Sequence, residues 1–301
     1  MFKKITIIGG GLIGSSILKA INKKRITKNI TIYDKSKKVM SFLKKENSKI
    51  NVSWDIHEAV RNADLTIMAV PLSAYKIILL NIKNDLKKNS ILTDTGSAKK
   101  EINKIVKKLN IKDISWIASH PIAGTEDSGP KAGFSELFEK RWCIISPGVN
   151  SKKRDVQNIK NFWKELGSKV KEMSFEEHDH ILSLTSHLPH AIAYNIVRTS
   201  INNGDKFRQE VIQYSAGGLR DFTRIAASDP LMWRDIFINN SDNIIKVLDT
   251  FSDNLKELKK AIKEKNGKKL FKIFSETKKV RKEIIKAGQD TDKSDFGRKK
   301  N

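Results

Sequence analysis

The chain has 301 residues, 39% of them hydrophobic, with 16 Gly and 6 Pro, which suits one large domain or two ordinary ones and excludes a disordered or fibrous protein. Its 58 basic and 34 acidic side chains give a net charge of +24, which raises nucleic acid or an anionic membrane as a partner. However, 47 of the basic residues are Lys and 11 are Arg, and Arg is the better phosphate clamp and base reader. We therefore favour lysine on solvated faces and expect neither partner.

The N-terminus and the single cysteine bear on localisation. The apolar run Ile5–Leu18 follows two lysines and imitates a signal peptide, but four glycines interrupt it and no convincing cleavage pattern follows. No run of 18 apolar residues indicates a spanning helix. Cys143 has no second cysteine with which to form an intramolecular disulfide or a zinc finger. These features favour the cytoplasm.

The first half of the chain alternates short apolar runs with amphipathic stretches. Stretches such as Ile13–Lys24 and Lys99–Leu109 predict helices between the strands. Runs of four to six residues, rich in β-branched side chains, predict strands at Lys4–Ile8, Ile30–Tyr33, Leu65–Val70, Ile91–Asp94, Trp116–Ser119 and Cys143–Ser146, with a last short strand at Val170–Met173. Strand and helix repeated in this way predict a parallel sheet covered on both faces.

The second half shows helical periodicity and no convincing strand. Its predicted helices are Glu176–Ile201, Gln209–Gly217, Pro230–Asp249, Asp253–Glu264 and Leu270–Ala287, followed by a polar tail. We therefore predict an α/β domain over residues 1–172 and an all-α domain over residues 173–301.

A glycine motif lies between the first predicted strand and the helix that follows it. Gly9-x-Gly11-x-x-Gly14 would provide a tight turn, a close approach to a pyrophosphate and close packing of helix on strand. The helix N-terminus would face the anion with free N–H groups. The context favours a Rossmann-type nucleotide-binding domain over an unrelated glycine turn.

An acidic residue supports this interpretation. Asp34 follows the next strand, 20 residues beyond Gly14, where a carboxylate accepts hydrogen bonds from ribose hydroxyls and repels a 2′-phosphate. NAD is therefore expected over NADP, although Lys35 weakens that preference. We also assign Leu12 and Ile13 in the motif, and Val70-Pro71 at the end of the predicted strand Leu65–Val70, to the cofactor site.

Two polar segments follow strands whose carboxyl ends should meet at one edge of the sheet. His120, at the end of the fifth long strand, has the pKa of a natural general base, but it is equally expected as a capping or loop histidine. Ser97, beyond Ile91–Asp94, would hydrogen-bond a substrate hydroxyl or carry a proton; alone, it is more often a helix N-cap.

The helical half contributes two further segments. His187 and His190 share a helix face and, with His178 and His180, raise a metal site, but no Cys or HExxH spacing supports one and Pro189 kinks the helix, so no metal is expected. In the second segment, Arg220 and Arg224 lie on a glycine-broken helix and are candidate carboxylate clamps. We expect one of these two arginines to form a structural Arg–Asp pair instead.

Taken together, five segments resemble the prephenate/arogenate (cyclohexadienyl) dehydrogenase family of tyrosine biosynthesis. They occur in the family's order over residues 9–233, and the third and fifth are highly specific. They read GGGLIGSS at 9–16, DTGSAK at 94–99, SHPIAGTEDSGP at 119–130, SHLPHAIA at 186–193 and SAGGLRDFTRIAASDPLMW at 215–233.

The resemblance implies an oxidoreductase acting on a CH–CH donor, with hydride transfer to NAD⁺ and release of CO₂. His120 matches the catalytic histidine, Ser97 the serine that supports the ring hydroxyl, and Arg224 the arginine that binds a substrate carboxylate. The helical domain would form a homodimer and close the cleft. The remaining pocket positions are matched by Glu126, His187, His190 and Trp233.

Several alternatives stay open. The choice between prephenate and arogenate is not decided, although the segments resemble the broad-specificity type. Too few residues follow Trp233 for an additional regulatory domain, so feedback by tyrosine cannot be deduced. The runner-up is another NAD(P)-linked dehydrogenase with the same two-domain layout, acting on a small carboxylate. A basic nucleic-acid-binding protein is the alternative from another class, but residues 181–240 carry a net charge of only +1 whereas residues 251–301 carry +9.

Overall fold

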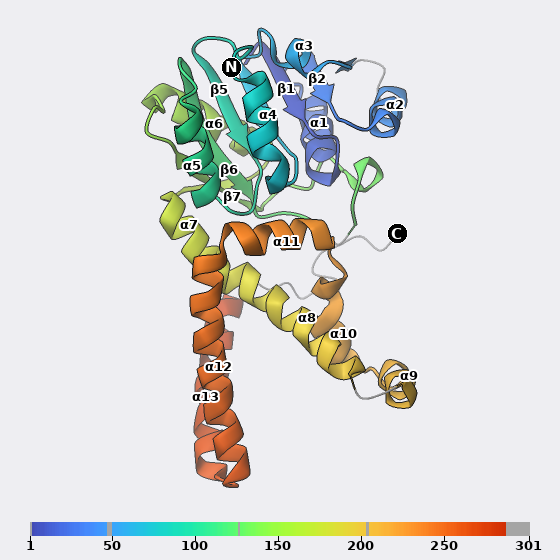
Figure 1. Cartoon of the computed structure of the whole chain (residues 1–301), viewed down its shortest axis with the longest axis vertical. Helices are drawn as coiled ribbons and strands as arrows, with labels where there is room; N and C mark the ends of the chain where they lie inside the picture. Colours follow the sequence, from blue (N-terminus) through green and yellow to red (C-terminus); the bar gives the residue numbers. More distant parts are fainter. Residues whose placement is uncertain (1, 47–49, 126, 203–204, 287–301) are drawn as a thin grey trace. The chain divides into compact units, whose positions relative to one another are not determined.

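The computed structural model describes residues 2–46, 50–125, 127–202 and 205–286 (Figure 1). By its internal contacts the chain forms two compact units, Met1–Ile244 and Ile245–Asn301. The first unit contains an eight-stranded sheet and the helices α1 to α11. Within the described part of the chain, no helix is both long enough and apolar enough to cross a membrane.

The sheet has the strand order β3-β2-β1-β4-β5-β6-β7-β8. Neighbouring strands from β3 to β6 are parallel, which with this order is the Rossmann arrangement that the sequence predicts. The strands are β1 Lys4–Ile8, β2 Asn29–Tyr33, β3 Asn51–Val52, β4 Leu65–Met68, β5 Ser90–Asp94, β6 Ile114–Pro121, β7 Trp142–Pro147 and β8 Lys169–Glu172.

The predicted parallel arrangement holds up to β6 and changes at the last two strands. β7 runs antiparallel to β6, with His120 opposite Ile144, and β8 is parallel to β7. A parallel neighbour needs a crossover connection, usually a helix. Among its described residues, the connection from β6 to β7 carries only the short 3₁₀ turn Pro130–Ala132, and the chain returns in the opposite direction.

Helices cover both faces of the sheet, as predicted. One core holds Ile17 of α1 and Trp163 of α6, and the other holds Tyr75 of α4 and Ile102 of α5, all fully buried. The helices of this part are α1 Leu12–Lys24, α2 Lys37–Glu46, α3 Ile56–Val60, α4 Tyr75–Ile82, α5 Lys100–Leu109 and α6 Lys153–Glu165.

The helical half divides more finely than the sequence suggests. The long helix expected over 176–201 is α7 Phe175–Leu182, a π-helical turn Ser183–His187 and α8 Leu188–Ile201, with Pro189 in the first turn of α8. The others are α9 Asp205–Gln213, α10 Gly217–Thr223, a 3₁₀ turn Arg224–Ala227, α11 Pro230–Asn239, α12 Ser241–Lys263 and α13 Gly267–Ile284.

A helix break at Asn240 replaces the single helix predicted over Pro230–Asp249. Asn240 is buried, and its amide donates to the backbone carbonyl of Asp179 at 2.8 Å. The Asn240 side chain therefore ties the junction between α11 and α12 to α7 by a hydrogen bond.

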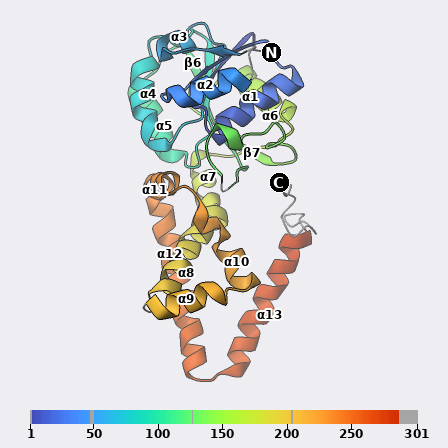
Figure 2. The ribbon, with the colours of Figure 1, turned by 90° about the vertical axis from the view of Figure 1, so that its right-hand side faces the viewer.

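The second unit holds the greater part of α12 and the helix α13, joined by a short turn (Figure 2). Asn266 caps α13 by accepting from Lys269 N at 3.0 Å, and Lys269 pairs with Glu257 of α12 at 2.8 Å. Several large apolar side chains of this unit are exposed, namely Leu255, Ile262, Phe271, Phe274 and Val280.

Candidate active site

The glycine turn after β1 is required by close packing. Gly9 has φ of +102°, and a Cβ there would lie 2.2 Å from the carbonyl oxygen of Ala69. A Cβ on Gly14 would lie 1.9 Å from the carbonyl oxygen of Gly9. A Cβ on Gly11 would meet no described atom within 4 Å. Gly9 thus allows close approach to the chain that follows β4, Gly14 allows α1 to pack on the turn after β1, and Gly11 leaves open space.

The N-terminus of α1 suits an anion. Gly11 is its N-cap, no described side chain caps the helix, and its first turn has no acidic residue. The first-turn N–H groups and the positive end of the helix dipole are then available to a phosphate. Leu12 and Ile13, in this turn, pack partly buried against the core.

The other predicted cofactor residues surround this turn. Asp34 follows β2, and its Oδ2 accepts from Gly10 N at 2.8 Å. Val70 lies beside Gly9, because a Cβ on Gly9 would come 2.9 Å from its Cγ1, and Pro71 is the N-cap of the 3₁₀ turn Leu72–Ala74. The structure therefore brings the carboxylate, the glycines and Val70 together.

The segment after β6 folds back onto the same helix. Phe134 N donates to Ser16 Oγ at 3.1 Å, and Lys19 Nζ donates to Gly133 O at 2.9 Å. The loop that follows His120 thus passes beside α1. Glu126, also predicted for the pocket, lies in this loop but outside the described residues.

A buried ion pair fixes the end of β6. Lys99 Nζ donates to Asp94 Oδ2 and to the carbonyl oxygen of Ser119, both at 2.6 Å, and the side chains of Lys99 and Asp94 are essentially inaccessible. Asp94 also accepts from Tyr75 Oη, Gly96 N and Ser119 N, each at 3.0 Å. Because Ser119 precedes His120, this network holds the backbone on which His120 is mounted.

His120 is buried and contacts a second histidine. Its Nδ1 lies 2.8 Å from Nε2 of His178, and Nδ1 of His178 lies 2.8 Å from Oδ1 of Asp179. Asp179 also accepts from the backbone N–H groups of Lys99 and Lys100, at 2.8 and 2.9 Å. The carboxylate on α7 therefore caps α5.

This geometry corrects one alternative for Ser97. The N-cap of α5 is Lys99 rather than Ser97, and the capping group comes from Asp179. Ser97 lies partly buried in the turn between β5 and α5, two residues before Lys99. It is therefore at the edge of the sheet that the sequence predicts.

The histidines of this cluster favour their neutral form. Burial holds the pKa of His120 well below its usual value of 6.5, and repulsion from the Lys99 ammonium, and from His178 and His187 whenever they are protonated, lowers it further. Burial also lowers the pKa of His178, although the Asp179 carboxylate opposes the shift. For His187, burial lowers the pKa to about 4. A neutral His120 is able to accept a proton.

The remaining predicted pocket residues lie together. The ring of His190 stacks on Trp233 with centroids 3.6 Å apart, and His187 meets Trp233 edge-on at 6.1 Å. Asn240 Nδ2 lies 3.1 Å from Nδ1 of His187. Buried Nε2 of His187 and Nε1 of Trp233 have no hydrogen-bond partner among the described residues, so both nitrogens are candidates to meet a ligand.

The two arginines have different surroundings. Arg220 is exposed and pairs with its neighbour Asp221 at 3.1 Å in a solvated contact. Arg224 is partly buried, and its charge contributes to the lowered pKa of His190. Of the two arginines, Arg224 is therefore the one whose charge reaches His190.

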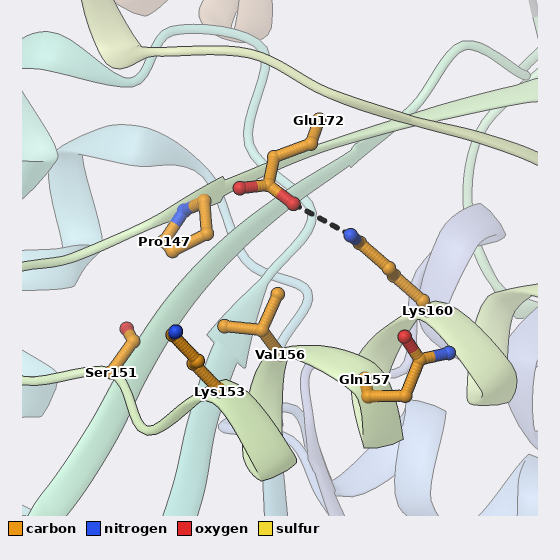
Figure 3. Close-up of a pocket in the computed structure, with 7 residues that line it drawn as sticks. All are labelled: Pro147, Ser151, Lys153, Val156, Gln157, Lys160 and Glu172. Atoms are coloured by element: carbon orange, nitrogen blue, oxygen red, sulfur yellow. Dashed lines mark ion pairs between the residues drawn. The ribbon is translucent and has the colours of Figure 1, made fainter.

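A surface pocket of about 320 Å³ lies elsewhere (Figure 3). It is lined by residues of α6 and the β7–β8 edge, and the Lys160–Glu172 pair, 2.7 Å apart, crosses it. Its Pro147 pairs with Ile117 on β6, three residues from His120 toward the amino end of that strand. None of His120, His178 and His187 lines this pocket.

Sequence reasoning missed the roles of Lys99, Asp94 and Asp179, and it considered His178 only as a metal ligand. In the part of the chain that is described, no three His, Cys, Asp or Glu side chains are arranged to hold a metal ion. The sequence feature that could have drawn attention to His178 and Asp179 is their position on the first predicted helix of the helical half. Nothing local identifies their partners, which are 58 and 80 residues away.

The free energy of unfolding at acidic pH should depend on the histidines that are neutral in the folded protein. Between pH 6.5 and 4 an unfolded His187 binds a proton that the folded one does not, so the free energy of unfolding falls with decreasing pH by about 3 kcal/mol from this residue alone. His120 and His178 act in the same direction. Urea unfolding at a series of pH values measures this, and a flat profile from pH 7 to 4.5 would contradict it.

A glycine turn for an anion and a buried neutral histidine, on one edge of a Rossmann sheet, define a nucleotide-dependent oxidoreductase. Family models described as "Prephenate dehydrogenase, nucleotide-binding domain" and "Prephenate dehydrogenase, dimerization domain" match residues 17–172 and 174–276. The chain therefore belongs to the prephenate dehydrogenase family.

Individual relatives agree with this assignment. The cyclohexadienyl dehydrogenase of Zymomonas mobilis is 41% identical over 93% of this chain and 96% of its own length. The prephenate dehydrogenase of Bacillus subtilis is 32% identical over 92% of this chain and 75% of its own length. A crystal structure of prephenate dehydrogenase from Aquifex aeolicus, in complex with hydroxyphenyl propionate and NAD⁺, has a TM-score of 0.87 and 30% identity, covering 94% of this chain and 99% of that one.

Proposed function

We propose that the protein catalyses the NAD-dependent oxidative decarboxylation of prephenate to 4-hydroxyphenylpyruvate, of arogenate to tyrosine, or of both. The observation that carries the proposal is the buried, neutral His120 at the end of β6, on the same sheet edge as the glycine turn. The similarity of the chain to a cyclohexadienyl dehydrogenase and to a prephenate dehydrogenase supports this substrate class.

In this proposal His120 is the general base. It accepts the proton of the ring hydroxyl while hydride leaves the carbon that bears it, and the base therefore acts in the transition state. The ring carboxylate leaves as CO₂, the electron pair of the broken bond makes the ring aromatic, and the phenolate oxygen takes its proton back from the His120 imidazolium. NAD⁺ supplies the hydride acceptor. Ser97 supports the hydroxyl from the turn before α5.

The substrate is anionic, and the remaining residues bind it. Arg224 holds a substrate carboxylate with paired N–H donors. His187 and Trp233 present buried N–H or ring nitrogens without partners among the described residues, and His190 is held by stacking on Trp233. Glu126 completes the pocket in this proposal, on the strength of the sequence resemblance alone.

The cofactor set is the one that surrounds the glycine turn. Gly9, Gly11, Gly14, Leu12 and Ile13 hold the pyrophosphate at the N-terminus of α1. Asp34 binds the ribose hydroxyls and disfavours a 2′-phosphate, and Val70-Pro71 adjoin the turn. These contacts support NAD over NADP.

Two glycine substitutions should separate folding from cofactor binding. Gly11→Ala places a Cβ in open space, so we expect unchanged urea stability but at least tenfold weaker NAD⁺ binding, because the pyrophosphate needs that space. Gly14→Ala places its Cβ against Gly9 O and should lower stability as well. Calorimetric titration with NAD⁺ and urea unfolding give the two quantities. Wild-type affinity in Gly11→Ala would contradict the cofactor site.

Arg224→Gln should mainly raise the KM for prephenate, by roughly tenfold or more, because a charge-assisted hydrogen bond to a carboxylate is lost. Arg220→Gln is the matched control, since Arg220 is exposed and pairs with Asp221. Steady-state kinetics at saturating NAD⁺ measure both. An unchanged KM in Arg224→Gln together with a raised KM in Arg220→Gln would reverse the assignment.

We also propose a homodimer, a cytoplasmic location and a domain boundary at residues 172/173. The ends of the two family matches support the boundary. The match to a dimerization domain and the exposed apolar side chains of α12 and α13 support self-association. Light scattering of the purified chain tests the dimer.

The decisive experiment is incubation with NAD⁺ and, separately, prephenate and arogenate, with NADH followed by absorbance and CO₂ by release of label from the ring carboxylate. One NADH and one CO₂ per substrate are expected. NADH formation without CO₂ would favour a hydroxyacid-type dehydrogenase with the same two-domain layout.

A further inference from the structure

The inference concerns the three buried side chains His120, His178 and Asp179, and it rests on the proposed function of His120. We propose that His178 and Asp179 are positioning residues: they hold His120 in the tautomer protonated at Nδ1, which leaves Nε2 as the atom that accepts the substrate proton. The contacts between them carry the argument.

The argument begins at Asp179. Its Oδ1 accepts from Lys99 N and its Oδ2 from Lys100 N, at the N-terminus of α5. Both oxygens therefore act as hydrogen-bond acceptors, as they do in a carboxylate. An ionised carboxylate only accepts hydrogen bonds. The Nδ1 of His178, 2.8 Å from Oδ1, must therefore be the protonated nitrogen that donates.

The protonation of His178 then fixes that of His120. Burial lowers the pKa of His178, so its ring is neutral near pH 7 and carries one proton, at Nδ1. Its Nε2 is consequently an acceptor, and the Nδ1 of His120, 2.8 Å away, must donate to it. A neutral His120 that is protonated at Nδ1 is unprotonated at Nε2. The wrong tautomer would present an N–H where the reaction needs a base.

The charged groups around the chain of contacts are consistent with this assignment. Lys99, His178 and His187 face His120, and each disfavours a resting positive charge on it. Lys99, Asp94 and Asp179 face His178, and the two carboxylates favour its charged form. When His120 accepts the substrate proton, the resulting imidazolium donates through His178 toward the Asp179 carboxylate. The same contact therefore serves the base before and after proton transfer.

Two substitutions at position 178 separate this role from simple packing. In His178→Gln the amide oxygen can accept from His120 Nδ1–H, whereas in His178→Leu no acceptor remains. We expect His178→Leu to lower kcat by 10-fold to 100-fold and to displace the acidic limb of the pH profile, because His120 must be unprotonated to act as the base. NAD⁺ affinity should stay near wild type. His178→Gln should recover most of kcat, and His180→Leu, on the exposed side of α7, is the matched control.

The direct readout is nitrogen NMR of the wild-type protein labelled with ¹⁵N-histidine, with the His120 signals assigned by their loss in His120→Asn. Protonated Nδ1 and unprotonated Nε2 are expected at pH 7.5, and a mixture of tautomers in His178→Leu. A wild-type His120 protonated at Nε2 would overturn the proposal. So would a His178→Leu variant that keeps the wild-type tautomer, whatever its kcat. If the wild type turns over neither prephenate nor arogenate, the proposed function fails while the tautomer measurement still decides the geometry.

Discussion

Replacing His120 by Asn should lower kcat by about 10²-fold to 10⁴-fold, the range over which a positioned general base contributes. The Asn amide can still donate to Nε2 of His178, so the buried contact is kept, but it has no basic nitrogen to take the ring-hydroxyl proton. NAD⁺ affinity should remain near that of the wild type, because the glycine turn follows β1 and does not include His120.

Steady-state rates with prephenate or arogenate, together with calorimetric titration of NAD⁺, measure the two quantities. His180→Asn is the matched control, since His180 is exposed on the helix that carries His178. It should turn over as the wild type does. Normal turnover in His120→Asn, with the fold intact, would show that another group takes the proton and that His120 is a buried structural histidine.

The cofactor turn was predictable because its determinants are local. Gly9, Gly11 and Gly14 lie within six residues, after an apolar run and before an amphipathic one, and that spacing alone implies a strand, a tight turn and a helix. Asp34 was found by its distance along the chain from this motif. The strands β1, β2 and β5 could be placed for a similar reason, because buried parallel strands are short, continuous apolar runs.

The interior of the site was not predictable in this way. His178 and Asp179 resemble any polar pair in the first turns of a helix, and their meaning comes from His120 and Lys99, which the fold brings to them across 58 and 80 residues. The break at Asn240 has the same origin, since its amide binds the carbonyl of Asp179. Tertiary hydrogen bonds therefore determine the partners of His178 and Asp179 and the position of the helix break, which local periodicity does not specify.

Removal of one partner from the ion pair between Lys99 and Asp94 should have the largest single effect on stability in this region. Both side chains are inaccessible, and a buried charge that loses its partner costs far more than the pair itself contributes. Lys99→Met should therefore lower the free energy of unfolding by about 3–5 kcal/mol, because the Asp94 carboxylate stays buried without its cation. Burial lowers the pKa of Lys99, and the Asp94 carboxylate opposes that shift.

The double variant Lys99→Met/Asp94→Asn tests that explanation. It removes both charges, so it should lose less stability than Lys99→Met alone, although the amide cannot satisfy all the donors that Asp94 accepts from. Lys104→Met, in the exposed pair with Glu101, is the control and should leave the unfolding midpoint nearly unchanged. Urea unfolding at one fixed protein concentration measures all three. If the double variant were instead less stable than Lys99→Met, the explanation would fail. The loss would then come from hydrogen bonding and packing around Ser119 rather than from an uncompensated charge.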